Sequence, residues 1–468
     1  MRKLISVFIL FFSFFLSSQE PLFTLIDSEK TGITFSNDLV DTKDHSIFLY
    51  ANYYGGAGVG IGDFDNDGLD DIFLAANLID DKIYKNLGNF QFQDKTKLSG
   101  IINNGSWSTG VTVADVNNDG LLDIYVSCEL YDDAPFLRTN KLYINKGDFK
   151  FVESAKKWGV DVDRRTRHSV FFDYNNDGLL DLYLLNHPPN TGNFSPFFGS
   201  DMTLPEYNLQ LFENKGDHFV DVTEKAGLNR AGFPNAAVIG DFNKDGWADI
   251  YVANDFDAPD FLYFNNKDGS FSYKTESSLR HTSFYSMGVD AADINNDSYL
   301  DLMVLDMTAE DNFRLKSNMS GMNPDSFWNV VNGGGHYQYM FNTLQLNNGN
   351  NTFSDIAQFT GTAATDWSWA SLVADFDNDG NKDIYITNGL LRDIRNTDAD
   401  KKISEIVSKK INEYIIKNPD DNDISLWDVV NLKELLDILP SQKLKNYYFR
   451  NHGNLQFSNI TDDTGLNQ

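Results

Sequence analysis

The sequence predicts an all-β protein, a six- to seven-bladed β-propeller of four-stranded repeats with a small helical insertion. Two observations support this fold class. One nine-residue acidic loop recurs six times, and each copy is followed by an apolar run and then by an aliphatic-aromatic pair ahead of Asn and Gly. Self-similar units of about four short strands, with no strong helix inside them, are what a propeller blade requires.

The acidic loops share one pattern of candidate ligands. Every copy has Asp at positions 1, 5 and 9 and Asp or Asn at position 3. Oxygen-bearing side chains on alternate residues of one tight loop suit calcium, which takes roughly six to eight oxygen ligands. The sequence therefore predicts up to six Ca²⁺ sites, with these side-chain ligands: Asp63, Asp65, Asp67, Asp71, Asp115, Asn117, Asp119, Asp123, Asp173, Asn175, Asp177, Asp181, Asp241, Asn243, Asp245, Asp249, Asp293, Asn295, Asp297, Asp301, Asp375, Asp377, Asp379 and Asp383.

Plain hairpin turns are the alternative interpretation of these loops. Asp, Asn and Gly are frequent in tight turns for conformational reasons alone. A turn needs only two or three of them, however, and does not require Asp at position 9 in all six copies. The calcium interpretation therefore explains more of the pattern.

The residues after each loop predict strands. β-Branched and aromatic residues follow at once, as in Ile124-Tyr-Val126 and Ile384-Tyr-Ile386. An EF-hand loop, by contrast, ends in Glu and lies between two helices. The second signature, as in Leu142-Tyr-Ile-Asn145-Lys-Gly147, predicts a further strand and a turn.

These motifs resemble the FG-GAP or VCBS repeats of integrin-α-type propellers. The closer resemblance is to bacterial proteins of the cartilage-acidic-protein-like group, which carry VCBS repeats ahead of an ASPIC/UnbV domain. The resemblance implies that the loop Asp and Asn residues bind calcium and that the propeller is a recognition surface rather than a catalyst. The chain departs from the group because it shows no ASPIC/UnbV segment, so nothing known of that domain is carried over.

Composition and charge limit the classes of partner. The 468 residues carry a formal net charge of -30, and 41% are hydrophobic, enough for a substantial core. Such acidity argues against nucleic acid or an anionic membrane as a partner, because phosphates are neutralised by Lys and Arg. The repeats predict a single ring rather than independent domains.

The N-terminus predicts export. Arg2 and Lys3 precede an apolar run from Leu4 to Leu16, and Ser17 and Ser18 offer a cleavage site. We therefore expect a signal peptide over residues 1–18 and a propeller over 19–468, located extracellularly, at the cell surface or in the periplasm. No membrane insertion is expected after cleavage. The lone Cys128 excludes an internal disulfide.

The six loops are not equivalent. The first and sixth have Asp at position 3, and the others have Asn. The fifth has Ser298 where the rest have Gly, at a sharp turn where a Cβ costs about 1 kcal/mol or more. The Asp293 loop is therefore predicted to be the weakest calcium site.

Aligned positions ahead of the loops predict a ring of side chains. Equivalent positions in a propeller fall on one ring, and alternate residues of a strand share a face. The side chains of this ring either form a platform for a protein or a sugar, or pack between the blades. Arg165, Arg167 and His168 are the expected exceptions to packing, because charged groups seldom bury unpaired. The candidate ligand-binding residues are Trp107, Arg165, Arg167, His168, Tyr285, Trp367 and Trp369.

A helical insertion is predicted at about residues 392–445. Ile403, Ile406 and Ile411 recur at helical spacing, and a second apolar stretch begins after Ser425 and ends at Pro440. Two packed helices on the propeller's edge are expected. They either cover an exposed blade or bind a partner.

The sequence favours a secreted or cell-surface calcium-binding propeller that recognises protein or glycan ligands without catalysis. One alternative is a calcium-dependent polysaccharide-active enzyme, a lyase or hydrolase, although His168, His281 and His336 belong to no nucleophile motif. Another is a structural segment of a larger surface assembly. The identity of the ligand, the binding face and the oligomeric state stay open.

Both ends of the chain resemble half-units. Phe23–Asn37 looks like the segment that precedes a loop, and Phe457–Leu466 looks like another, so the last repeat is incomplete. Two explanations remain. The terminal half-units complete a closing blade between them, or the chain is the front part of a longer repeat protein.

Overall fold

The computed structural model describes residues 21–50, 52–188, 206–256, 258–319, 323–419 and 425–466. The predicted signal peptide at 1–18 lies outside the described residues. Within the described ranges, every helix is too short or too polar to cross a lipid bilayer.

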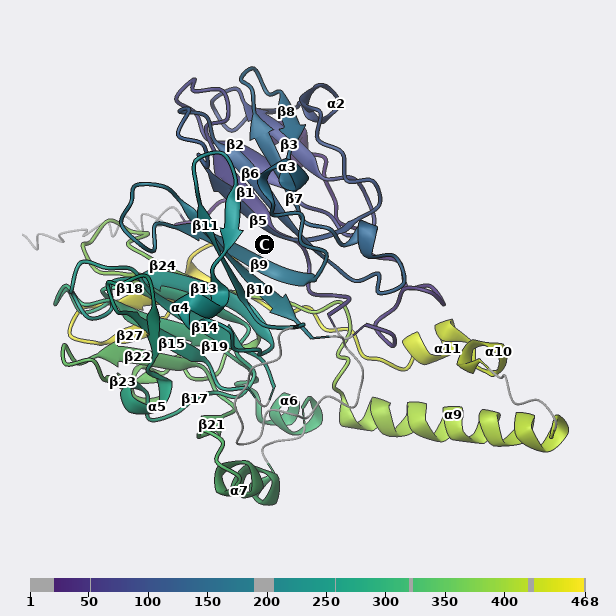
Figure 1. Cartoon of the computed structure of the whole chain (residues 1–468). Coiled ribbons are helices and arrows are strands. Elements are labelled where there is room, and N and C mark those ends of the chain that lie inside the picture. Colours follow the sequence, from purple (N-terminus) through teal and green to yellow (C-terminus); the bar gives the residue numbers. More distant parts are fainter. Residues whose placement is uncertain are drawn as a thin grey trace, which may run out of the picture.

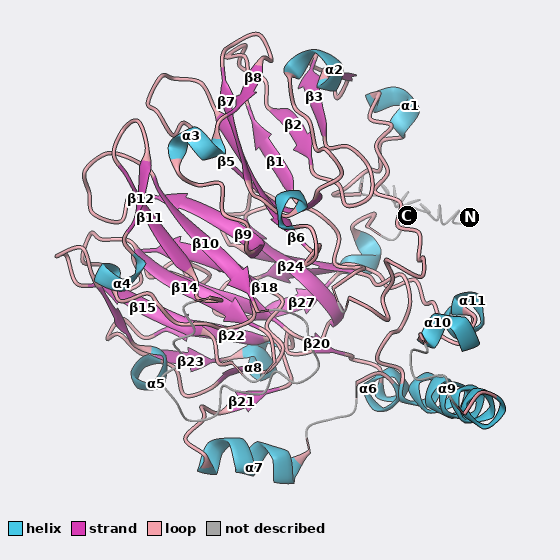
Figure 2. Cartoon of the chain, turned by 45° about the vertical axis from the view of Figure 1, so that its right-hand side comes forward, coloured by secondary structure: helices cyan, strands magenta, loops and turns pink. Residues whose placement is uncertain are grey.

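Six antiparallel sheets, five of four strands and one of five, follow one another around an arc (Figures 1 and 2), so the β-propeller prediction is confirmed. Each sheet is one blade, and the blades are numbered in chain order. Blade 1 contains β1 (Val59–Gly62), β2 (Asp71–Leu74), β3 (Lys82–Asn86) and β4 (Phe92–Asp94); blade 2 contains β5 (Trp107–Ala114), β6 (Asp123–Glu129), β7 (Lys141–Asn145) and β8 (Phe151–Glu153); blade 3 contains β9 (Arg165–Phe172), β10 (Asp181–His187), β11 (Gln210–Asn214) and β12 (Phe219–Asp221). Blade 4 contains β13 (Pro234–Gly240), β14 (Asp249–Asn254), β15 (Phe261–Asn265) and β16 (Phe271–Tyr273); blade 5 contains β18 (Gly288–Ala292), β19 (Asp301–Leu305), β22 (Thr343–Asn347) and β23 (Phe353–Asp355); blade 6 contains β24 (Asp366–Ala374), β25 (Asp383–Asn388), β26 (Tyr447–Asn451) and β27 (Phe457–Asn459).

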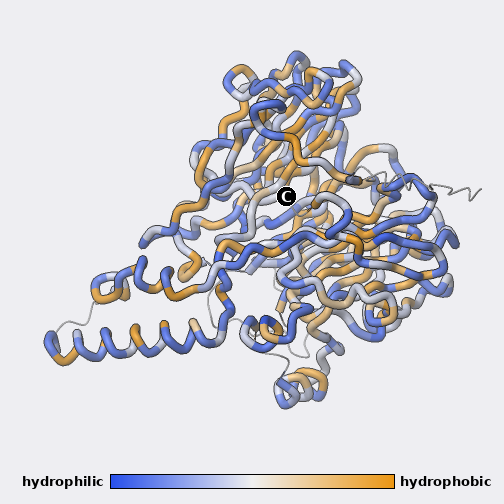
Figure 3. The backbone as a smooth tube through the Cα atoms, turned by 180° about the vertical axis from the view of Figure 1, so that it is seen from behind, coloured by the Kyte–Doolittle hydropathy of each residue, from blue (hydrophilic) through white to orange (hydrophobic). Residues whose placement is uncertain are grey.

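The core lies in the seams between consecutive blades. Five hydrophobic clusters join blades 1 and 2, 2 and 3, 3 and 4, 4 and 5, and 5 and 6. In the first seam, for example, Phe73 of blade 1 packs in the same cluster as Val111 of blade 2. Figure 3 shows hydrophobic residues along the sheets and hydrophilic ones along the loops and much of the protruding α9. Stacked sheets with apolar faces therefore hold the ring together.

Short helices connect the blades. Most of them end at a left-handed glycine, such as Gly100 with φ of 81°, a conformation that costs other residues more. The inter-blade helices are α1 (Ser28–Thr31), α2 (Thr96–Ser99), α3 (Ala155–Trp158), α4 (Thr223–Ala226), α5 (Thr275–Ser278) and α8 (Ala357–Thr360).

The helical insertion has three helices in the described residues, not the two that the sequence predicted. They are α9 (Thr397–Lys417), which projects from the body (Figure 1), α10 (Leu426–Val429) and α11 (Leu432–Leu436). Ser425 forms a capping box with Asp428. The second predicted stretch divides because the side chain of Asn431 accepts the N–H groups of Lys433 and Glu434 and starts a new helix.

A sixth hydrophobic cluster ties this insertion to the N-terminal segment. It includes Ile47 and Tyr53 ahead of blade 1, Trp107 of blade 2, and Ala399 and Leu436 of the insertion. The insertion therefore fastens blade 6 to the beginning of the chain. Smaller elements are α6 (Asn312–Ser317), α7 (Pro324–Asn332), β17 (Thr282–Ser283) paired with β21 (Gln338–Tyr339), β20 (Met307–Thr308) on blade 6, and the 3₁₀ turns at Pro135–Leu137 and Thr461–Asp463.

Candidate functional site: acidic loops and an aromatic cavity

All six acidic loops use the same backbone hydrogen bonds. In blade 3 the Asp173 carboxylate accepts the N–H of Asp177 at 3.1 Å and that of Gly178 at 2.8 Å. The Asp177 carboxylate in turn accepts the N–H of Leu179 at 2.9 Å. Asn176, with φ of 57°, and Gly178, with φ of 85°, provide the left-handed turns that bring these groups together. Asp at positions 1 and 5 therefore shapes each loop as well as offering free oxygen lone pairs.

The Asp at position 9 is buried in every loop. Asp181 is fully buried, and its two oxygens accept the N–H of Tyr174 at 3.1 Å and that of Asn214 at 2.8 Å. Burial raises the pKa of Asp181 and that of Asp123 to about 7. The backbone hydrogen bonds that each carboxylate accepts act in the opposite direction and lower its pKa. A cation beside such a carboxylate would favour its ionised form.

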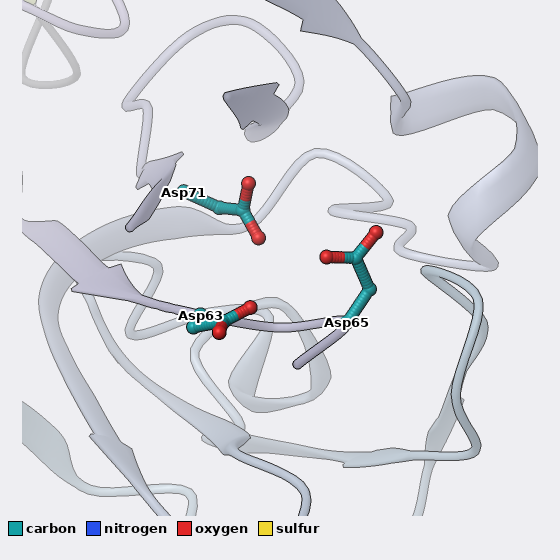
Figure 4. Close-up of side chains that lie close together, drawn as sticks. All are labelled: Asp63, Asp65 and Asp71. Atoms are coloured by element: carbon teal, nitrogen blue, oxygen red, sulfur yellow. The ribbon is translucent and has the colours of Figure 1, made fainter. Parts of the chain in front are cut away.

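Three carboxylates converge in the first and sixth loops. Ligand atoms of Asp63, Asp65 and Asp71 all lie within 4.8 Å of one another, and Figure 4 shows the three carboxylates turned toward one space. Asp375, Asp377 and Asp383 form the equivalent group in blade 6. In the first loop, Asp65 Oδ1 is buried and has no hydrogen-bond partner among the described residues. A buried oxygen without a partner fits a cation ligand, so these residues would hold Ca²⁺ and the metal would supply charge neutralisation and cross-linking.

Two basic residues that the sequence interpretation missed border these same loops. Lys85 contacts Asp65 and lies 2.6 Å from Asp67. Arg450 lies 2.7 Å from Asp377. A signal was present in the sequence: a base precedes the Asn of the second signature only in the two blades with Asp at position 3. The other four blades have Ile144, Glu213, Phe264 and Leu346 there.

The fifth loop keeps the common geometry despite its serine. Ser298 has φ of 69°, and its N–H donates to Asp293 at 2.7 Å, as the glycines do in the other loops. A Cβ in this left-handed conformation costs about 1 kcal/mol. The weakness of the Asp293 loop as a calcium site stays a prediction.

A cavity of about 240 Å³ opens at the other end of the innermost strands, away from the loops. Tyr285, Trp367 and Trp369 of the predicted ring line it, with Phe256 beside them. Trp107 does not line it, because its ring packs 5.2 Å from that of Tyr53 and is buried. The structure thus brings three of the four predicted ring aromatics together and places the fourth in a core cluster.

The basic members of the predicted ring are paired or enclosed. Arg165 contacts Asp132, and Arg167 lies 3.5 Å from the buried Glu129. Arg167 and His168 line the central channel of the ring, a second cavity of about 240 Å³. Burial lowers the pKa of His168 to about 4, with a further contribution from the neighbouring Arg167. Arg167 and His168 therefore lie inside the channel, and Arg165 lies outside it, paired with Asp132.

Charged residues of the first cavity were also missed. Asp255, Arg395 and Asp400 line it together with the aromatic side chains. Burial raises the pKa of Asp255 to about 7, opposed by the Phe256 N–H that donates to it at 2.8 Å. Asp255 follows β14 directly, and the other two lie at the start of the insertion, so only the folded ring brings them to one place.

Comparisons with known proteins agree with this architecture. The model of the FG-GAP-like repeat matches residues 63–126, 199–252, 241–304 and 323–386. Cartilage acidic protein 1 of Xenopus tropicalis is 26% identical over 164 residues, which are 35% of this chain and 24% of that protein. The chain thus aligns with about a quarter of the length of that relative.

Solved structures are more distant. An ancestral GH74 enzyme gives a TM-score of 0.37 at 13% identity, over 71% of this chain and 35% of that one. A Trypanosoma rangeli sialidase in complex with sialic acid gives 0.33 at 9% identity, over 75% and 56%. Similarity at this level does not bear on activity.

The repeat matches, together with the six sheets and loops, show that the chain belongs to the FG-GAP-like repeat family.

Proposed function

We propose that the protein is an exported, calcium-binding propeller that recognises a protein or glycan ligand without catalysis. The observation that carries this proposal is the cavity at the end of the innermost strands away from the loops, which combines aromatic side chains with Asp255, Arg395 and Asp400. Aromatic faces suit sugar rings and apolar side chains, and the charged groups fix orientation. The loops at the far ends of the same strands would hold calcium and stiffen the platform.

The ligand proposal is tested by glycan-array and pull-down binding with and without EDTA. Tyr285→Ala and Trp369→Ala remove aromatic surface from the cavity, and each should weaken binding about tenfold or more. Phe359→Ala is the matched control, because Phe359 is 75% exposed on α8 and does not line the cavity. Ligand binding that all three variants retain would contradict the proposed site.

Calcium binding is tested by titration of the metal-free chain. We expect saturable binding at several sites, with affinity in the submillimolar range of extracellular calcium modules. Ser298→Gly relieves the left-handed strain of the fifth loop and should tighten the weakest site about fivefold. A titration in which Ser298→Gly leaves every site unchanged would contradict the predicted weakness of the Asp293 loop.

A polysaccharide-active enzyme is the second candidate, and one observation favours it. Asp255 is a buried carboxyl group in the cavity with a pKa near neutrality, the property of a general acid, and Asp400 also lines the cavity. Incubation with a panel of polysaccharides and calcium, followed by assays for reducing and unsaturated ends, separates the two functions. Turnover that Asp255→Asn abolishes would establish the enzyme and overturn the non-catalytic proposal.

A further inference from the structure

A buried asparagine on the third strand joins the acidic loops of consecutive blades. In blade 4, Asn265 Nδ2 donates to Tyr174 O, at position 2 of the third loop, at 2.8 Å. The same nitrogen donates to Ala248 O, at position 8 of the fourth loop, at 3.2 Å. Four other blades repeat this pair of bonds, and all five side chains are buried. We call these residues the seam asparagines: Asn145, Asn214, Asn265, Asn347 and Asn451.

The main chain of each seam asparagine holds the position-9 carboxylate of its own loop. The Asn265 N–H donates to Asp249 Oδ1 at 2.8 Å, and Asp249 Oδ2 accepts the N–H of Phe242 at 3.0 Å. The carbonyl of Phe242 accepts in turn from Nδ2 of Asn347, the next seam asparagine, at 2.8 Å. All three bonds are buried. One candidate calcium ligand is therefore connected to the next loop through hydrogen bonds that lie out of water.

The same connection recurs between every two consecutive loops, and we call the whole series the seam chain. At each step a position-9 carboxylate accepts the position-2 N–H, and the carbonyl of that same position-2 residue accepts from the next seam asparagine. Buried hydrogen bonds in series polarise one another, because little water screens them. The carboxylates that the seam chain joins are, in order, Asp71, Asp123, Asp181, Asp249, Asp301 and Asp383.

The orientation of each seam amide is fixed by a further bond. Asn265 Oδ1 accepts the N–H of Lys267 at 2.9 Å, so its nitrogen must face the two loop carbonyls. The other four seam asparagines accept in the same way from the residue two positions later. A side chain without an amide would leave two carbonyls without this donor and one N–H without this acceptor. Each bridge therefore depends on asparagine.

We propose that the seam asparagines position the calcium ligands and couple neighbouring loops, so that cation binding in one loop strengthens binding in the next. The proposal rests on the calcium binding proposed above. A position-9 carboxylate that is held by a cation also holds the position-2 residue of its loop, whose carbonyl orients the next seam asparagine. Part of the ordering that the next loop needs is then already present, and such shared ordering gives positive coupling.

Electrostatics alone predicts the opposite sign. A cation in one loop repels a cation in the next, so loss of the first cation should tighten the second site. Seam asparagines that only hold the blades together would leave each loop independent of its neighbour. The seam chain predicts instead that loss of a cation from one loop weakens the next site. The sign of the effect therefore separates the three explanations.

Trp247 makes the fourth loop observable by itself. It stands at position 7, and none of the other five loops contains a tryptophan. The probe is Tb³⁺, which takes the oxygen ligands that suit Ca²⁺ and emits light when a nearby indole transfers its excitation. The metal-free whole chain is titrated with Tb³⁺ under excitation of tryptophan. The emission of Trp247→Phe is subtracted, so the difference reports binding in the fourth loop.

Asp177→Ala removes an exposed candidate ligand from the third loop and leaves the fourth loop unchanged. We expect this variant to raise the Tb³⁺ concentration for half saturation of the fourth loop about fivefold. Glu224→Ala is the matched control, because it removes one exposed carboxylate of α4, outside the acidic loops. It should leave the fourth loop unchanged.

Asn265→Ala cuts the bridge between the third and fourth loops. In this background, Asp177→Ala should no longer weaken the fourth loop, as a double-mutant cycle measures. Asn347→Ala removes the same group one seam further along and is the matched control. The response of the fourth loop to Asp177→Ala should persist in it, whatever the absolute affinity.

Hydrogen exchange provides a readout that leaves every seam asparagine in place. In saturating Ca²⁺, Asp177→Ala should speed exchange of the Asn265 N–H about fivefold relative to the unchanged chain, although this group lies in the next blade. Glu224→Ala should not change it. Equal exchange rates of the Asn265 N–H in all three proteins would overturn the proposal even if Asn265→Ala failed to fold.

The Tb³⁺ titrations can overturn the proposal in three further ways. A fourth loop that binds equally well or more tightly in Asp177→Ala would mean that the loops are independent or coupled by repulsion alone. Weakening that persists in Asn265→Ala would mean that the coupling does not pass through the seam asparagine. Absence of any emission that depends on Trp247 would contradict cation binding in this loop, and thus the calcium proposal itself.

Discussion

The two ends of the innermost strands differ in how far the blades repeat one another. At the loop end, six copies use the same hydrogen bonds from positions 1, 5 and 9, and even Ser298 adopts the left-handed turn. At the cavity end, the equivalent positions differ in residue type and in contacts: Gly55, Tyr285 and Trp367 line the cavity, Trp107 packs on Tyr53, and Arg165 contacts Asp132.

This difference indicates a division of labour within each blade. Repetition at the loop end means that the same stabilising contact is made six times, so its contributions add up over the ring. At the cavity end, equivalent positions in the six blades carry different residue types. The resulting surface is asymmetric, as recognition of a specific ligand requires. Changes at the loop end should therefore act on stability, and changes at the cavity end should act on binding or on pH response.

Calcium removal should have the largest effect. At ten times its dissociation constant, each ion stabilises the fold by about 1.4 kcal/mol, so EDTA should lower the Tm by roughly 5 to 10 °C. Tyr285→Ala at the cavity end should leave the Tm of the calcium-loaded chain nearly unchanged. Calorimetry measures both. Equal shifts from chelation and from the cavity variant would remove the distinction between the two ends.

Asp181→Asn should destabilise the protein by about 2 kcal/mol even without calcium. The amide nitrogen would face one of two buried N–H groups, from Tyr174 and Asn214, and leave it without an acceptor. Asp177→Asn is the control, because Asp177 lies on the exposed part of the same loop. Urea unfolding in EDTA compares them. A control that is equally destabilised would mean that loss of charge, rather than burial, sets the cost.

Asp255→Asn should change the pH dependence of stability. Burial raises the pKa of Asp255 from 3.8 to about 7, so the folded chain keeps a proton that the unfolded chain releases. This contribution is fully present below pH 3.8 and is lost as the pH rises toward 7. The native protein should therefore lose stability relative to Asp255→Asn between pH 4 and 7, as measured by denaturant midpoints. Parallel pH profiles would contradict the pKa assignment.

Lys85→Met should have the smallest effect, a tighter first loop. Removal of the Lys85 cation, which contacts Asp65 and Asp67, makes the first loop more negative. The free energy of calcium binding should improve by about 1 kcal/mol, which corresponds to roughly fivefold stronger binding. Lys82→Met on the same strand is the control, because Lys82 pairs with Asp94, at 3.3 Å, and with no loop carboxylate of the described residues. Calcium titration that shows equal affinities for the two variants would mean that Lys85 does not compete with the metal.

The parts of the fold that the sequence predicted are those encoded locally. A loop such as Asp173–Asp181 carries its own ligands, turn residues and following strand, so the repeat, the strand order and the propeller could be recognised without long-range information. Lys85 and Arg450 were missed because their partners lie about twenty to seventy residues away and become neighbours only through strand pairing. The cavity was predicted in part: the ring alignment found Tyr285, Trp367 and Trp369 but not Phe256, and Arg395 and Asp400 come from an insertion that has no counterpart in the other blades.

Phe23 has a consequence for how the chain is made. It packs on Phe376 and Tyr448, and its N–H donates to Thr464 O at 2.8 Å. A ribosome produces Phe23 long before these partners, so the segment around Phe23 stays undocked until blade 6 has emerged. Contacts between residues so far apart in sequence form slowly. Docking of Phe23 therefore follows the synthesis of blade 6, whereas the seams between consecutive blades can close earlier.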